Sequence, residues 1–154
     1  MRIYIGSDHA GFELKAKVGA ALRGLGHDVI DCGPEAYVST DDYPPYCLTT
    51  ATRTVADPGS LGIVIGGSGN GEAIAANKVK GARCVLAHSE ETARLGREHN
   101  DANVISFGAR TIAEADALRY AMLFVATTFR HDLRHQRRID MLTKFEATGE
   151  IPPL

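Results

Sequence analysis

A short apolar run that leads into a glycine-rich loop constrains this chain more than any other stretch. Leu61 to Ile65 is apolar and rich in β-branched residues, which is typical of a buried strand. Four glycines follow within six residues, and the segment from Glu72 to Lys78 has the composition of a helix start, with a carboxylate in its first turn. A strand, a loop and a helix in this order direct backbone N–H groups to one edge of a sheet, where they stabilise negative charge.

Two common nucleotide-binding motifs do not fit this loop. A Walker A loop ends in Gly-Lys-Ser/Thr, whereas this loop ends in Gly71-Glu72-Ala73. The dinucleotide fingerprint has the spacing G-x-G-x-x-G, and counted from Gly67 its last position is Glu72. The loop therefore predicts an anion cradle with a carboxylate at its rim. A tight turn whose glycines only allow the strand and helix to pack closely is the alternative.

The rest of the chain alternates strand and helix patterns. Strands are predicted over residues 2–6, 28–33, 61–65, 83–87 and 103–107. Helical patterns are predicted over residues 14–25, 41–56, 72–78, 89–99, 111–128 and 134–147. This alternation predicts one α/β domain over residues 1–154, a three-layer, doubly wound, Rossmann-like fold with a parallel five-stranded sheet.

Composition narrows the classes of partner. The formal net charge of −2 gives no basic footprint, so no nucleic-acid partner is expected. No apolar run approaches the roughly 18 residues of a membrane span, and the first residues read as a strand rather than a signal peptide. The odd number of scattered cysteines predicts reduced thiols in a cytoplasmic protein, acting as small apolar fillers, with a catalytic cysteine as the less favoured alternative: Cys32, Cys47 and Cys84.

Several polar residues directly follow predicted strands. In a doubly wound sheet, ligands bind beyond the carboxyl ends of the strands, near the switch in strand order. Asp8 and His9 follow the first strand, Ser68 and Glu72 belong to the glycine loop, and Arg110 follows the last strand. Simpler interpretations remain open, because an acidic residue in a first helical turn is often a dipole partner and an Asp after a strand is often a helix cap.

His99 and Asn100 end a predicted helix that precedes a strand, so the topology assigns them to the opposite edge of the sheet. Only a shifted loop or a packing partner would bring them to the other candidates. A basic cluster predicts a solvated helix face and is also a mild indication of a phosphate-bearing ligand: Arg130, His131, Arg134, His135, Arg137 and Arg138. No metal site is expected, because arginines flank the one histidine pair at helical spacing.

Four motifs then occur together in a specific order. They are Gly6-Ser-Asp-His-Ala-Gly11, Gly66-Gly-Ser-Gly-Asn-Gly71 followed by Ile74-Ala-Ala-Asn-Lys78, Glu98-His-Asn100 and Gly108-Ala-Arg110. Each motif alone is weak, but the set resembles the type B ribose-5-phosphate isomerase family, which includes the galactose-6-phosphate isomerase subunits. The resemblance covers nearly the whole chain. It implies a doubly wound homodimer, or a dimer of dimers, that has active sites between subunits and converts ribose 5-phosphate to ribulose 5-phosphate without metal or cofactor.

The same resemblance implies roles for individual residues. Many members place a cysteine base where this chain has Gly66, and the most similar subgroup uses a glutamate, which matches Glu72. His99 is implied to open the furanose ring. The implied substrate-binding residues are Gly67, Ser68, Gly69, Asn70 and Gly71 around the enediolate, Asp8, Tyr43 and Asn100 on the sugar, and His9, Arg110, Arg134 and Arg138 on the phosphate, the last two from the C-terminal helix of the partner subunit.

Two alternatives remain at this point. The first alternative is an isomerase of another aldose phosphate, such as a tetrose, allose or galactose phosphate. It stays open because nothing in the loop from Pro34 to Pro45 indicates the size of the pocket. The second alternative belongs to a different functional class: a catalytically silent protein that binds a sugar phosphate. The joint presence of Glu72, His99 and the arginines disfavours the silent protein.

Overall fold

The computed structural model describes residues 1–153 and confirms the predicted alternation of strands and helices. The strands are β1 (Arg2–Ser7), β2 (Asp28–Asp31), β3 (Leu61–Gly66), β4 (Cys84–Leu86) and β5 (Val104–Gly108). The helices are the short 3₁₀ helix η1 (His9–Gly11) and the α-helices α1 (Phe12–Gly24), α2 (Tyr43–Ala56), α3 (Asn70–Ala76), α4 (Glu90–Asn100), α5 (Glu114–Ala126) and α6 (Leu133–Thr148).

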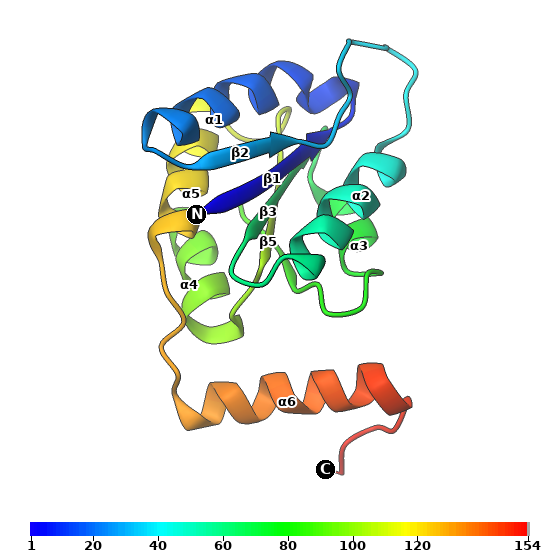
Figure 1. Ribbon diagram of the computed structural model, residues 1–154, viewed down its shortest axis with the longest axis vertical. Coiled ribbons are helices and arrows are strands. Elements are labelled where there is room, and N and C mark those ends of the chain that lie inside the picture. Colours follow the sequence, from blue (N-terminus) through cyan, green and yellow to red (C-terminus); the bar gives the residue numbers. More distant parts are fainter. Residues whose placement is uncertain (154) are drawn as a thin grey trace.

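The five strands form one parallel sheet in the order β2-β1-β3-β5-β4 (Figure 1). The connection from β1 runs outward to β2, and the chain then returns to place β3 on the other side of β1. The switch in strand order therefore lies between β1 and β3. In such sheets the crevice at the carboxyl ends of these two strands is the ordinary position of a ligand.

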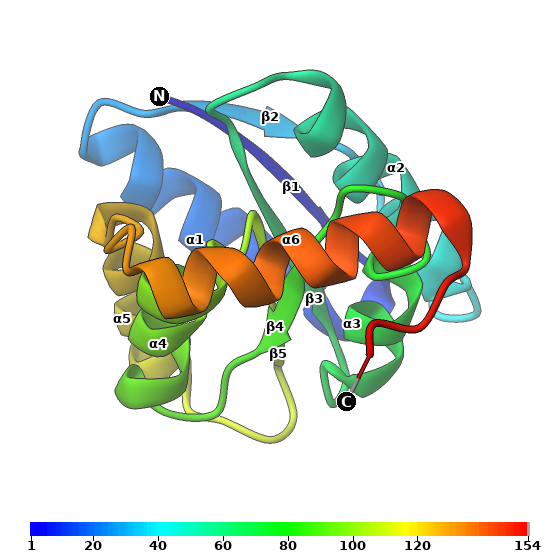
Figure 2. The same ribbon diagram turned by 90° about the horizontal axis from the view of Figure 1, so that it is seen from below.

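Helices cover both faces of the sheet, which confirms the predicted three layers (Figures 1 and 2). Helices α1, α4 and α5 cover one face of the sheet, and helices α2 and α3 cover the other. Every residue of β3 is buried. A strand covered on both faces has no solvent side, and this explains why its sequence is apolar without alternation.

Several element boundaries differ from the sequence-based prediction by a few residues. Helix α3 begins at Asn70 instead of Glu72, because Gly69 has a φ of +83° that turns the chain directly into the helix. Helix α5 covers 114–126 instead of 111–128, since Thr111 and Ile112 belong to the turn that follows β5. Ser89 caps helix α4, and Thr92 completes a reciprocal capping box.

Helix α6 lies apart from the two helical layers. It crosses below the edge at which the strands begin and packs against α4 (Figures 1 and 2). Only His135 and Ile139 of this helix are buried, while several of its large apolar side chains are exposed: Leu133, Met141, Leu142 and Phe145. No helix within residues 1–153 combines the length and apolarity that a membrane span requires.

Lys15 of α1 provides the first test of what holds the fold near the strand switch. Its Nζ is buried and donates to Asp31 Oδ1 at 2.7 Å and to the carbonyl oxygen of Pro34 at 2.8 Å, which fixes the start of the loop between β2 and α2. We expect Lys15→Met to lower the free energy of unfolding by about 2 kcal/mol, since the buried carbonyl oxygen of Pro34 loses its donor and the half-exposed Asp31 loses its ion-pair partner. Chemical denaturation measures this loss.

Lys17 on the same helix is the matched control. It forms an exposed ion pair with Glu114 at 2.6 Å, with about half of each side chain accessible to solvent. Exposed pairs contribute little, so Lys17→Met should change the free energy of unfolding by less than about 0.5 kcal/mol. Equal losses in the two variants would contradict the role assigned to Lys15.

Candidate active site

The carboxyl ends of β1 and β3 bring one group of the predicted site residues together. Asp8 directly follows β1, and its Oδ1 accepts hydrogen bonds from the backbone N–H groups of Ala10 at 2.9 Å and Gly11 at 3.3 Å. The simple interpretation of Asp8 as a helix cap is therefore correct for one oxygen. Its other oxygen lies 4.0 Å from Nδ1 of His9 and remains available to a ligand.

Glu72 has the environment of a proton-transfer group rather than of a helix-dipole partner. It lies in the first turn of α3 but is only 4% exposed, and its Oε2 has no hydrogen-bond partner among residues 1–153. Burial raises the pKa of Glu72, the charge of Asp8 raises it further, and backbone N–H groups only partly oppose the shift. A carboxylate that is desolvated in this way is a stronger base than one in water.

The space for Glu72 exists because residue 66 is glycine. A Cβ built on Gly66 would overlap the carboxyl group of Glu72. Any side chain at the end of β3 would therefore force the Glu72 carboxylate out of its present position. The carboxyl group of Glu72 therefore occupies the space that a side chain at position 66 would fill, and the two positions depend on each other.

Several other predicted residues surround the glycine loop. The buried hydroxyl of Ser106 in β5 donates a hydrogen bond of 2.7 Å to the carbonyl oxygen of Gly69 and so fixes the loop on the sheet. The Tyr43 ring lies against Gly71, so close that no side chain would fit there, and the Arg110 side chain lies beside Gly67. Ser68 and Asn70 are exposed at the tip of the loop.

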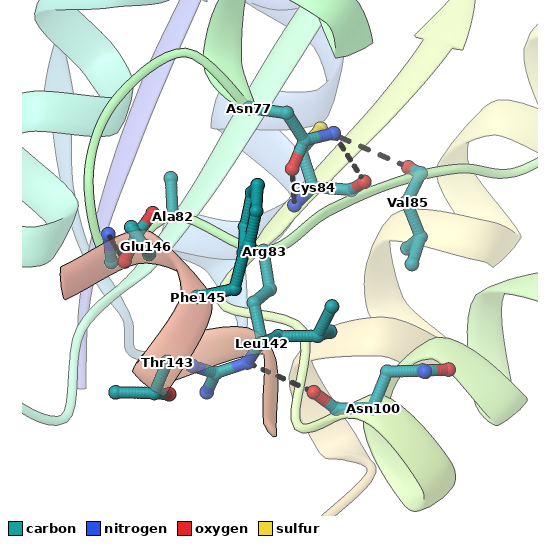
Figure 3. Close-up of a pocket in the computed structure, with 11 residues that line it drawn as sticks. Asn77, Ala82, Arg83, Cys84, Val85, Asn100, Leu142, Thr143, Phe145 and Glu146 are labelled. Atoms are coloured by element: carbon teal, nitrogen blue, oxygen red, sulfur yellow. Dashed lines mark hydrogen bonds between the residues drawn. The ribbon is translucent and has the colours of Figure 1, made fainter. Parts of the chain in front are cut away.

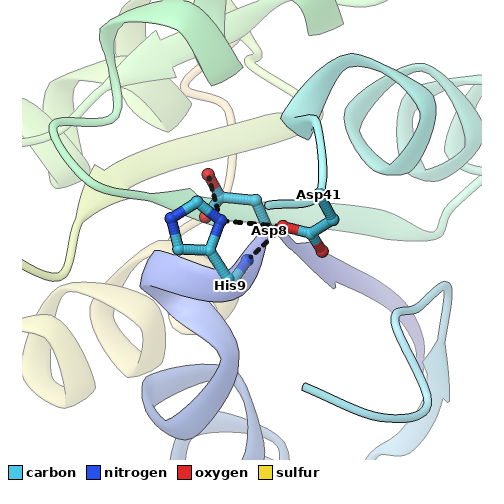
Figure 4. Close-up of side chains that lie close together, drawn as sticks. All are labelled: Asp8, His9 and Asp41. Carbon is cyan, nitrogen blue, oxygen red and sulfur yellow. Dashed lines mark hydrogen bonds and ion pairs between the residues drawn. The ribbon is translucent and has the colours of Figure 1, made fainter. Parts of the chain in front are cut away.

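His9 stands at the rim of the same crevice and is held by a residue that the sequence analysis did not assign. Its backbone N–H and its ring Nδ1 both lie 2.8 Å from Oδ1 of Asp41, in the loop before α2 (Figure 4). In the sequence, Asp41 is predicted only as the start of a helix over residues 41–56. No local pattern could have paired it with a histidine 32 residues away.

The side chains of Asp8, His9 and Asp41 also offer one possible metal-ligand atom each, all within 4.8 Å of one another. Their approach is already accounted for by the hydrogen bonds of His9 to Asp41 and by the capping role of Asp8. The expectation of a metal-free site therefore stays a prediction, which treatment with a chelator would test.

A second group of predicted residues lies at the opposite edge of the sheet. His99 and Asn100 end α4, directly before β5 begins, and Arg134 and Arg138 are exposed on α6. Glu98 pairs with Arg94 and Arg130, but among residues 1–153 no ion pair involves Arg134, Arg137 or Arg138. This edge therefore presents unneutralised positive charge next to an imidazole ring.

His135 corrects one part of the sequence analysis. It was assigned to the solvated basic face, but it is buried and stacks on His99 with ring centroids 4.2 Å apart and planes 14° from parallel. Burial lowers the pKa of His135, and the charges of His99 and Arg134 lower it further. The reason is that α6 folds back onto α4, which the sequence pattern of α6 alone does not reveal.

One chain does not bring the two groups together. Glu72 lies beyond the end of β3, and His99 lies before the start of the neighbouring β5, which runs parallel to it. Strands of five or six residues separate these edges by about 17 Å or more. The topological expectation for His99 and Asn100 is therefore confirmed within a single chain.

A cavity of about 550 Å³ lies between α6 and the start of β4, on the side of the second group (Figure 3). Its lining includes Leu142 and Phe145 of α6, together with Arg83, Cys84 and Asn100. It contains no acidic group from the strand switch. We therefore assign it to the packing surface of α6 and not to the site of the chemistry.

The three cysteines fit the predicted role of fillers. All three are free thiols, and burial raises the pKa of each of them: Cys32, Cys47 and Cys84. A thiol with a raised pKa is a weak nucleophile at neutral pH. The alternative of a catalytic cysteine finds no support in these positions.

An open parallel sheet, with a desolvated carboxylate beside a glycine loop at its strand switch, is the arrangement of an enzyme that moves a proton on a small anionic substrate. The family model described as Ribose/Galactose Isomerase matches residues 3–142. The chain belongs to the ribose/galactose isomerase family, which confirms the resemblance found in its motifs.

Individual relatives are similar over their whole length. The ribose-5-phosphate isomerase B of Mycobacterium leprae is 58% identical over 154 residues, covering 100% of this chain and 95% of that protein. The structure of ribose-5-phosphate isomerase B from Mycoplasma genitalium with bound ribulose 5-phosphate is 36% identical, with a TM-score of 0.92 over 96% of this chain and 97% of that one. The structure of a mutant type B ribose 5-phosphate isomerase from Trypanosoma cruzi is 34% identical, with a TM-score of 0.91 over 97% of this chain and 98% of that one.

The raised pKa of Glu72 predicts a stability effect with a defined sign. The folded protein holds the Glu72 proton to higher pH than the unfolded chain, so the ionised side chain lowers stability increasingly as the pH rises above the ordinary value of 4.5. We expect Glu72→Gln to raise the melting temperature at pH 8 by about 3 °C for each kcal/mol relieved, and to have no such effect near pH 4. Calorimetry at the two pH values measures this.

Glu91→Gln is the control for that measurement. Glu91 also lies in a first helical turn, that of α4, but it is exposed. Its loss should lower stability slightly, by about 0.5 kcal/mol, because a favourable charge at a helix N-terminus disappears. A Glu72→Gln protein that is less stable at pH 8 would refute the desolvation argument.

Proposed function

We propose that this protein interconverts ribose 5-phosphate and ribulose 5-phosphate by proton transfer through an enediolate. The buried carboxylate of Glu72, whose Oε2 has no hydrogen-bond partner among residues 1–153, carries the proposal, because it supplies a base next to a set of anion-stabilising N–H groups. The relatives support the choice of substrate, since ribose-5-phosphate isomerases B are 57–58% identical to this chain over its full length.

In the proposed reaction Glu72 removes the proton from C2 of the open-chain aldose and returns a proton to C1, while the hydroxyl proton of O2 passes to O1. Negative charge develops on the two substrate oxygens in between, and the backbone N–H groups from Gly67 to Gly71, with Ser68, stabilise it. The raised pKa of Glu72 brings the base closer to the working pH, which favours both halves of the transfer. Asp8 and Tyr43 bind hydroxyl groups or line the wall of the sugar site.

The second group of residues completes the site from another copy of the chain. His99 protonates the ring oxygen and opens the furanose, Asn100 contacts the sugar, and Arg134 and Arg138 bind the phosphate together with His9 and Arg110 of the first chain. A two-fold dimer presents the same surface twice, so each chain would give one group to each of two sites. The exposed apolar side chains and the cavity at α6 support this partner, either in a dimer or in a dimer of dimers.

A galactose phosphate or another aldose phosphate is the second candidate substrate, because the matching family model covers galactose as well as ribose isomerases. We place the enzyme in the cytoplasm, where its three free thiols would stay reduced. A catalytically silent binding protein is disfavoured, because binding alone does not require a buried carboxylate whose desolvation lowers the stability of the fold.

An assay on aldose phosphates of four to six carbons tests the proposed activity. We expect the highest kcat/KM on ribose 5-phosphate and no loss of activity after treatment with EDTA, since no step requires a cation. A higher kcat/KM on another sugar would transfer the assignment to that substrate. Activity that disappears with EDTA and returns with a divalent cation would overturn the metal-free mechanism.

Mixing two inactive variants tests whether the site is shared. If Glu72 and His99 come from different chains, dimers of one Glu72→Gln chain and one His99→Ala chain contain one intact site and one doubly altered site. Random exchange of subunits should then restore about a quarter of the wild-type activity, because half of the dimers are mixed and half of their sites are intact.

The control mixture contains Glu72→Gln and Asp8→Asn, two changes in the same group. These variants should not complement each other, since every mixed site would carry one of the two changes. Mass spectrometry monitors the exchange of subunits. If the first mixture regains no activity although its subunits have exchanged, His99 does not act across the interface.

A further inference from the structure

The loop between β2 and α2 contributes a carboxylate whose purpose the proposed reaction does not explain. Asp41 is enclosed, with 8% of its side chain exposed, although its neighbours in the loop are exposed. Its Oδ1 accepts two hydrogen bonds of 2.8 Å, one from the backbone N–H and one from ring Nδ1 of His9. Figure 4 shows the other ring nitrogen of His9 directed away from both nearby carboxylates.

We propose that Asp41 is a positioning residue for His9, which it holds with Nδ1–H toward the protein and Nε2–H toward the phosphate group of the substrate. The inference rests on the proposed function, in which His9 is part of the phosphate clamp. It adds a residue that none of the sequence motifs contains.

The chemistry of imidazole requires such a partner. A neutral ring carries one proton, so a ring that donates from Nδ1 would present a lone pair at Nε2 and repel a phosphate oxygen. Only the imidazolium donates from both nitrogens. Two carboxylates lie near Nδ1, Asp41 at 2.8 Å and Asp8 at 4.0 Å, while the Tyr37 ring meets the edge of the imidazole. Because ionised carboxylates only accept hydrogen bonds, this arrangement keeps an N–H at Nδ1 and leaves Nε2 to face the substrate.

Asp41 itself is built to remain ionised. Burial opposes its charge, but the hydrogen bonds from the backbone and ring of His9, with a smaller contribution from the nearby Tyr46 hydroxyl, outweigh burial and hold the pKa of Asp41 below its ordinary value. The loop is fixed at its start by Lys15 and at its end by α2, so Asp41 has little freedom to move away from His9.

The decisive variant is Asp41→Asn, which keeps an oxygen acceptor for both bonds but removes the charge. We expect KM for ribose 5-phosphate and the inhibition constant of inorganic phosphate each to rise about tenfold, the loss of one charge-assisted hydrogen bond, while kcat stays within about twofold. Asp42→Asn is the matched control, because Asp42 is the neighbouring carboxylate, is exposed and makes no side-chain cap hydrogen bond. It should leave both constants unchanged.

A double-mutant cycle separates positioning from general stability. If Asp41 acts through His9, the variant with both His9→Asn and Asp41→Asn should bind phosphate no more weakly than His9→Asn alone. Additive losses would overturn the inference, as would equal effects of Asp41→Asn and Asp42→Asn. If Asp41→Asn does not fold, Asp41→Ser provides the same comparison.

The outcomes also distinguish this inference from the proposed function. If His9→Asn weakens phosphate binding and Asp41→Asn does not, only the role of Asp41 is wrong. If His9→Asn has no effect on phosphate, the phosphate role of His9 and this inference are both wrong. Activity restored to an EDTA-treated enzyme by a divalent cation would show that the Asp8, His9 and Asp41 cluster holds a metal, and would overturn the hydrogen-bonded arrangement.

Discussion

The burial of a single carboxylate, Glu72, is the constraint on which the rest of the site depends. Removing an ionised group from water without a partner is unfavourable, so the fold has to impose it. Gly66 supplies the space, Gly69 turns the chain so that α3 starts beside β3, and the packed sheet prevents the loop from relaxing. The stability that this arrangement gives up is the source of the raised pKa of Glu72, on which the proposed proton transfer depends.

The polarity of the sheet imposes a second constraint. All five strands are parallel, so residues after strands and residues after helices lie at opposite edges. An acidic, glycine-rich group forms at one edge. At the other edge lies an imidazole beside arginines that form no ion pair within the described residues 1–153, next to an α6 that is poorly covered. Neither group is a complete catalytic site. The proposed association of two chains resolves a difficulty that no rearrangement within one chain resolves without breaking the sheet.

The contacts of His9 and His99 illustrate why positioning residues escape sequence analysis. Both histidines belong to recognisable motifs, but the residues that hold them do not. Asp41 lies in an irregular loop, and His135 lies in a helix whose charged residues suggested a solvated face. Each contact joins residues more than thirty positions apart. Periodicity and spacing report only on neighbours within a turn or a strand.

The sequence by itself determined the alternation of strands and helices, the parallel sheet, the edge to which each candidate belongs and the family. These follow from local patterns: the apolar run of β3, the helical periodicities between the strands and the four ordered motifs. Only the tertiary structure decided that Glu72 is buried rather than a surface dipole partner, that Asp41 holds His9, and that α6 folds back so that His135 stacks on His99. The physical reason is that desolvation and hydrogen-bond geometry depend on every segment that surrounds a group, and these segments meet only when the chain is folded.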